Sequence, residues 1–116
     1  MNDKKYDLEE RLIDFAVAII NFVETLPNTK SANHLGGQLL RSGTSPSLNY
    51  GEARSAESQN DFIHKMKIAA KEADETEYWL LLCLLSKNYP KNEQLSEKLN
   101  IIIKILSKII STSKVD

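Results

Sequence analysis

The chain has little glycine or proline, a single cysteine, and no excess of charge of one sign. Four glycines and three prolines among 116 residues are too few for the many turns of a β-sandwich or β-barrel. The single cysteine, Cys83, excludes a disulfide within the chain and a zinc site built from several thiolates. A net charge of −1 excludes a polybasic nucleic-acid arm and an acidic disordered tail. The composition therefore favours one all-α domain with a free, buried thiol.

Long apolar runs are also missing. The longest extends only from Trp79 to Leu85, whereas a membrane-spanning helix needs about 18 to 20 apolar residues. The first residues, MNDKKYDLEE, lead into an interrupted amphipathic pattern rather than the apolar core of a signal peptide. We therefore expect a cytoplasmic protein with no membrane partner.

Four segments share an alternating spacing of three and four residues between core positions, which is typical of helices packed in a bundle. They cover about residues 6–26, 33–56, 58–87 and 92–111. The second segment contains Pro46, so we expect a kink there. The core positions of each segment form one stripe along its predicted helix. In segment order, the stripes are Leu8, Leu12, Phe15, Ile19, Phe22 and Leu26; Leu35, Leu39, Ser42, Pro46, Asn49, Ala53 and Ala56; Phe62, Met66, Ala69, Ala73, Thr76, Leu80 and Cys83; and Leu95, Leu99, Ile102, Leu106 and Ile109.

The helix starts carry capping residues. Ser31 or Asn33 is expected to cap the second helix, and Asn92 the fourth. Ser58 followed by Asp61 resembles a capping box at the start of the third helix. Four helices of similar length with short connections predict an antiparallel, up-down-up-down four-helix bundle formed by residues 1–116 as one domain.

The first and fourth helices carry more apolar residues than one core absorbs. Exposed apolar patches of several hundred Å² usually mark an interface, so we expect a homo-oligomer. The alternative is that helix curvature and long side chains cover these residues within one chain. The candidate interface residues are Ile13, Ile20, Val23, Ile101, Ile103, Ile105 and Ile110.

No arrangement typical of an enzyme is present. Neither a nucleophile paired with a histidine nor a glycine-rich phosphate loop occurs. Asp61 and His64 have the spacing of one arm of a di-iron bundle site, but the second arm is missing. We therefore predict a protein without catalytic residues, metal or cofactor.

A polar stripe on the second helix faces acidic residues on the third, and Arg41 is expected to pair with one of those acids. The stripe is either a buried hydrogen-bonded network that fixes helix register or a surface for a ligand or partner. A small-molecule or metal-binding bundle, with Arg41 and Glu72 or Glu75 as polar determinants, is one alternative function. The stripe comprises Arg41, Ser45, Asn49 and Glu52, and the acids are Glu72, Glu75 and Glu77.

Only the last helix is basic. Lys98, Lys104 and Lys108 are the candidate nucleic-acid contacts, and an oligomer would repeat them around its surface. The simpler interpretation is a solvated polar face.

Two blocks of the chain resemble the small bundle proteins encoded in intervening sequences of bacterial 23S ribosomal RNA genes. The first block is RSGTS at residues 41–45, followed by Asn49 and Glu52. The second is FIHKMKIAAKEADETEYWL, from Phe62 to Leu80. The resemblance implies a four-helix bundle, commonly a homopentamer, without established enzymatic activity. The positions carried over are Arg41, Ser42, Thr44, Ser45, Asn49, Glu52, Lys71, Glu72, Glu75, Thr76, Tyr78 and Trp79.

A related branch comprises the accessory bundle proteins of diversity-generating retroelements. Similarity to that branch implies binding of nucleic acid and of a reverse transcriptase. The branch is strongly basic, whereas the pI of this chain is about 6.1. A scaffold or accessory role is therefore the primary expectation, and RNA binding within a ribonucleoprotein is the alternative.

Overall fold

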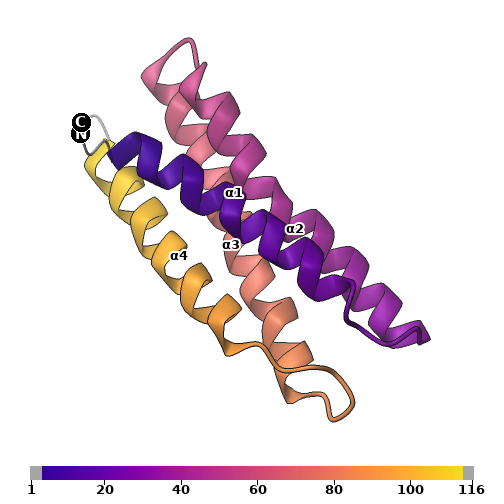
Figure 1. Ribbon diagram of the computed structural model, residues 1–116. Coiled ribbons are helices and arrows are strands. Elements are labelled where there is room, and N and C mark those ends of the chain that lie inside the picture. The colour runs from indigo at the N-terminus through magenta and orange to yellow at the C-terminus, as the bar shows by residue number, and fades with distance from the viewer. Residues whose placement is uncertain (1–3, 114–116) are drawn as a thin grey trace.

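The computed structural model describes residues 4–113, with side chains from Leu8 onward, and forms four α-helices joined by short connections (Figure 1). These are α1 (Lys4–Val23), α2 (Lys30–Arg54), α3 (Gln59–Leu85) and α4 (Glu93–Ser113). Each helix packs on the next, and α1 also packs on α4. Successive helices run in opposite directions (Figure 1), so the predicted all-α, up-down-up-down bundle is confirmed.

The core is built from the predicted stripes. Their members on α1 and α4 are long apolar side chains, whereas those on α2 and α3 are mostly small. Small residues let two helices approach closely, and α2 and α3 have the most extensive contact in the bundle. The stripe residues buried in the core are Leu8, Leu12, Phe15, Ile19 and Phe22; Leu39, Ser42, Pro46 and Ala53; Met66, Ala69, Ala73, Thr76, Leu80 and Cys83; and Leu95, Leu99, Ile102 and Leu106.

The prediction for the second helix cap is wrong. Thr29 is the N-cap of α2, because its hydroxyl accepts a hydrogen bond from the backbone N–H of Ala32 at 3.2 Å. Ser31, one of the predicted caps, instead lies 2.7 Å from the Tyr89 hydroxyl and joins α2 to the α3–α4 connection. The helix therefore begins three residues earlier than expected and continues through Pro46 without interruption.

The third helix begins as predicted. The Ser58 hydroxyl accepts a hydrogen bond from the backbone N–H of Asp61 at 3.0 Å. At the other end of α3, Lys91 folds back and donates hydrogen bonds to the carbonyls of Cys83 and Leu84, at 3.3 and 2.6 Å, and to that of Ser86. The last carbonyls of a helix lack most of their backbone partners, and here that of Cys83 also accepts from the backbone N–H of Ser86 at 3.3 Å. The ammonium group adds donors for these carbonyls and so stabilises the helix end.

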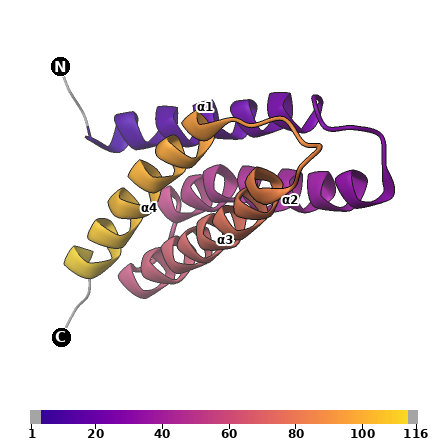
Figure 2. The same ribbon diagram turned by 90° about the horizontal axis from the view of Figure 1, so that it is seen from below.

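The fourth helix runs obliquely to α1 when the bundle is seen from below (Figure 2). Near its start, Lys98 is 2.7 Å from Asp14 of α1, an ion pair that joins the first and last helices. At its other end, the carbonyl of Ser113 accepts a hydrogen bond from the Gln59 side chain at the start of α3. Within residues 4–113, no helix is long and apolar enough to cross a membrane.

Candidate functional site

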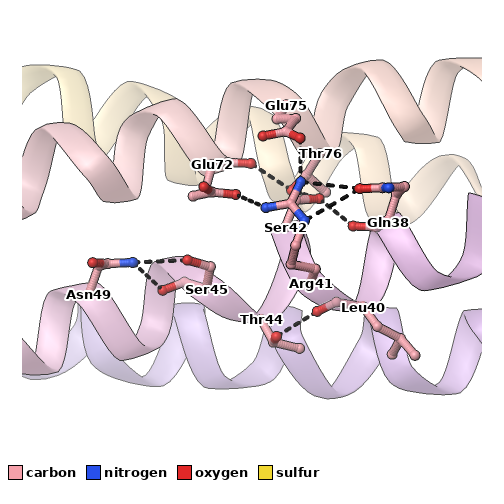
Figure 3. Close-up of polar contacts among 10 residues, drawn as sticks. All are labelled: Gln38, Leu40, Arg41, Ser42, Thr44, Ser45, Asn49, Glu72, Glu75 and Thr76. Atoms are coloured by element: carbon pink, nitrogen blue, oxygen red, sulfur yellow. Dashed lines mark hydrogen bonds and ion pairs between the residues drawn. The ribbon is translucent and has the colours of Figure 1, made fainter.

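Arg41 is the centre of the polar cluster that the sequence indicated. Its guanidinium donates to Glu72 Oε1 at 2.9 Å and also to Glu75, so it holds two carboxylates of α3 from its place on α2 (Figure 3). Gln38, one turn earlier on α2, accepts two further hydrogen bonds from the same guanidinium at 3.3 Å. Arg41 thus bonds to two of the three predicted acids, rather than to one, and to a glutamine that the sequence did not indicate.

The cluster lies where the α2–α3 contact meets solvent. The Arg41 side chain is 49% exposed, whereas that of Glu72 is 17% exposed. Partial desolvation would lower the pKa of Arg41, but the hydrogen bonds and charges of Glu72 and Glu75 outweigh it and raise the pKa above its usual value. Exposed ion pairs contribute only about 0.2 to 1 kcal/mol each, so the cluster orients the two helices more than it stabilises the fold.

A second polar contact lies beneath this cluster, in the core. Ser42 and Thr76 are both fully buried, and their hydroxyl oxygens are 2.9 Å apart. Each hydroxyl also has a carbonyl acceptor one turn earlier on its own helix, that of Gln38 at 2.9 Å for Ser42 and that of Glu72 at 2.7 Å for Thr76. The contact satisfies two buried polar groups with each other and with the backbones of α2 and α3, and it fixes how α2 aligns with α3.

The rest of the predicted stripe does not join the Arg41 cluster. Asn49 donates to the carbonyl and hydroxyl oxygens of Ser45, at 3.0 and 2.9 Å, within α2 (Figure 3). Thr44 donates to the carbonyl of Leu40, also within the helix. Glu52 forms an ion pair with Lys65 of α3 at 2.9 Å, and this bond is the main reason that the pKa of Lys65 is raised. The stripe therefore divides into three separate contacts.

The remaining motif residues lie further along α3. Lys71 and Tyr78 are exposed, whereas Trp79 is half-buried. The Trp79 ring meets the His34 ring of α2 edge-on, with centroids 6.1 Å apart. Its indole nitrogen is buried, with no hydrogen-bond partner in the described part of the chain. Both rings add apolar contact between α2 and α3.

The chemistry available to this cluster is limited. Glu72 and Glu75 are both bonded to Arg41, which leaves neither as an unpaired base. No group of three His, Cys, Asp or Glu side chains between residues 8 and 113 is placed to hold a metal ion. The cluster therefore joins α2 to α3 through ion pairs and hydrogen bonds.

The candidate interface residues fall into two sets. Ile13, Ile20 and Ile101 are exposed large apolar side chains. The others are half-buried and pack against the core, as the single-chain alternative expected; they are Val23, Ile103, Ile105 and Ile110.

The three candidate nucleic-acid lysines are also separated. Lys98 is bonded to Asp14 of α1. Lys104 and Lys108 stand one turn apart on α4 and are exposed, and their ammonium groups have no hydrogen bond or ion pair among the described residues. The structure therefore brings only these two together.

Comparisons with known proteins agree on the family. A family model described as 23S rRNA-intervening sequence protein matches residues 4–111. A solved structure from Bacteroides thetaiotaomicron, described as a protein with unknown function from the S23 ribosomal protein family, is 39% identical with a TM-score of 0.82. That similarity covers 89% of this chain and 97% of the other. A search of curated proteins found no match. The chain belongs to the 23S rRNA-intervening sequence protein family.

Proposed function

We propose that this protein is a non-catalytic homo-oligomer that serves as a scaffold or accessory factor, with its subunits arranged in a closed ring. Five is the number of subunits that we expect. The observation that carries the proposal is a set of exposed apolar side chains on two opposite edges of the bundle.

The first edge follows α1 and α2. Ile13, Val17 and Ile20 are 52%, 49% and 42% exposed, and their spacing places them on one face of α1. Leu40 and Leu48 are exposed on α2, the helix packed beside it. These five side chains expose apolar surface to water, and covering that surface would be favourable at about 25 cal/mol per Å².

The second edge follows α3 and α4. Tyr78, Leu81, Leu82 and Leu85 are exposed over the last turns of α3. Tyr78 and Leu81 also line a groove of about 380 Å³ between α3 and α4. Because α1 packs on α2 and α4 but not on α3, this edge lies across the bundle from the first.

Two different apolar edges favour a contact between unlike surfaces. If the α1–α2 edge of one subunit packs on the α3–α4 edge of the next, every subunit uses both edges. Such a head-to-tail contact closes into a ring when its rotation allows. A single self-complementary edge would instead give a dimer and leave the other edge exposed.

The test is the mass in solution, measured by size-exclusion chromatography with light scattering. The unmodified protein is expected as an oligomer, and Ile20→Glu and Leu81→Glu should each give smaller species that remain helical by circular dichroism. Asn21→Glu is the control, because Asn21 is an exposed polar residue of the same helix. A monomeric unmodified protein would contradict the proposal.

Mixing the two variants tests the head-to-tail arrangement. Each variant keeps one intact edge, so the mixture should form a dimer containing one copy of each. If the contact joined like edges, one variant alone would keep its assembly and mixing would change nothing.

Absorbance through the same chromatographic peak tests the scaffold role. A scaffold that carries no nucleic acid should show the 260 to 280 nm ratio of a protein. Excess absorbance at 260 nm would instead favour the RNA-binding alternative.

A further inference from the structure

A large recess lies away from the Arg41 cluster, where α2 ends and α3 begins. Its volume is about 900 Å³, within the usual range of small-molecule pockets. The C-terminal half of α4 forms its other wall, and this end of the bundle is the one at which α1 begins (Figure 1).

The interior of this recess is apolar. Tyr50 and Ala53 of α2, both almost fully buried, form its floor. Phe62 of α3 and Ile105 and Ile109 of α4 form its walls. These three are half-buried, so their carbon surface is only partly covered by the chain itself. The interior would therefore accept an aliphatic chain.

The rim of the recess is positively charged. Lys104 and Lys108 of α4 and Arg54 of α2 stand on it, with Glu57 as the one acidic residue. Arg54 is already bonded to Glu9 at 2.7 Å, and its guanidinium lies over the Tyr50 ring. The two lysines, by contrast, have no ion pair among the described residues.

From this juxtaposition of an apolar interior and two unpaired ammonium groups, we propose that the recess binds a free medium-chain carboxylate, such as a fatty acid. The chain occupies the space between Phe62 and Ile109. The carboxylate lies at the rim beside Lys104 and Lys108. Charge selects the sign of the headgroup, and apolar burial supplies most of the affinity.

The proposal is tested by isothermal titration of the protein, in its natural assembly, with octanoate, decanoate and dodecanoate below their micelle-forming concentrations. Affinity should rise about threefold to fourfold for each added methylene, as expected for transfer of that group out of water. Decyltrimethylammonium, with the same tail length and opposite charge, should bind at least about tenfold more weakly than decanoate. Absence of saturable binding, or an affinity independent of chain length, would overturn the proposal.

A pair of double variants tests the headgroup site. Lys104→Gln with Lys108→Gln should weaken decanoate binding about tenfold, because two ammonium groups are lost. Lys67→Gln with Lys71→Gln is the matched control: these lysines have the same spacing, are exposed, and lie on α3 outside the recess. All four residues are exposed, so neither double variant should alter the helical circular dichroism. Equal decanoate affinity in the two double variants would refute the assignment of the lysines.

Discussion

Thr76 Oγ1 lies 2.9 Å from Ser42 Oγ at a fully buried point between α2 and α3. Thr76→Val keeps the shape but removes the hydroxyl, and we expect it to lower the free energy of unfolding by about 1 kcal/mol. Ser42→Ala should have a similar cost, because in each variant the remaining hydroxyl keeps a carbonyl acceptor on its own helix, that of Gln38 for Ser42 and that of Glu72 for Thr76. Urea denaturation of both variants measures the two costs.

The double variant tests whether the two changes affect the free energy of unfolding independently. Ser42→Ala with Thr76→Val should be less destabilising than the sum of the single changes, with a coupling of about 0.5 to 1.5 kcal/mol. Strict additivity would mean that the two hydroxyls do not stabilise each other.

Gly43 provides a second prediction, because it lies against Ile19 of α1. A Cβ at this position would be 3.0 and 3.1 Å from the two γ carbons of Ile19, a fully buried side chain branched at its β carbon. Since neither branch can move aside freely, Gly43→Ala should destabilise the protein by about 1 to 2 kcal/mol despite the better helix propensity of alanine. Thermal and urea unfolding measure the change.

Gly51 is the matched control on the same helix. A Cβ there meets nothing within 4 Å, so Gly51→Ala should stabilise α2 by up to about 1 kcal/mol. If Gly43→Ala were equally stabilising, the close approach of α1 and α2 would not depend on this glycine.

Lys91 carries a third prediction, at the C-terminal end of α3. Lys91→Met keeps the aliphatic stem but removes the donor to the carbonyls of Cys83 and Leu84. Its loss should cost about 0.3 to 1 kcal/mol, since the residue is exposed. Lys87→Met, a change of the same type at a nearby exposed lysine, should cost less. Equal costs in urea denaturation would show that Lys91 stabilises the protein through general charge only.

Much of the fold could be predicted because apolar periodicity repeats along each helix and short connections leave few ways to pack four helices. The N-cap of α2 could not be predicted in this way. Thr29, Ser31 and Asn33 all have suitable side chains, and the choice depends on where Ser31 meets Tyr89, a contact between distant parts of the chain. Such tertiary contacts determine where a helix begins or ends, and the periodicity of apolar residues does not predict them.

The candidate site, like the fold, could be predicted only in part. The sequence placed Arg41 opposite the acids of the third helix, but the pairing of Glu52 with Lys65 depends on the register between α2 and α3. The recess depends on the course of α4 past the end of α2, so its lining residues share no pattern within any one helix. Contacts between helices therefore determine the ion-pair partners and the lining of the recess, which the spacing of residues within one helix does not predict.

Cys83 supplies the last prediction, through its burial. The thiol is 1% exposed, and desolvation raises its pKa above the ordinary 9.0, an effect that the positive charge of Lys91 partly opposes. The folded protein thus keeps the thiol proton at a pH where the unfolded chain has lost it. The stability contributed by the neutral thiol is fully present below pH 9.0 and is lost as the pH rises from there through the folded pKa.

Urea denaturation across that pH range, compared with Cys83→Ala, measures this contribution. The variant should be about 1 to 2 kcal/mol less stable at neutral pH, because it leaves a small cavity. Above pH 9.0 the difference should narrow, by at most about 1.4 kcal/mol per pH unit, since only the unmodified protein loses stability through this group. Because burial also shields the sulfur, a thiol reagent should react slowly with the folded protein and rapidly in urea. A gap that stayed constant, together with rapid reaction in the folded state, would mean that Cys83 is open to solvent.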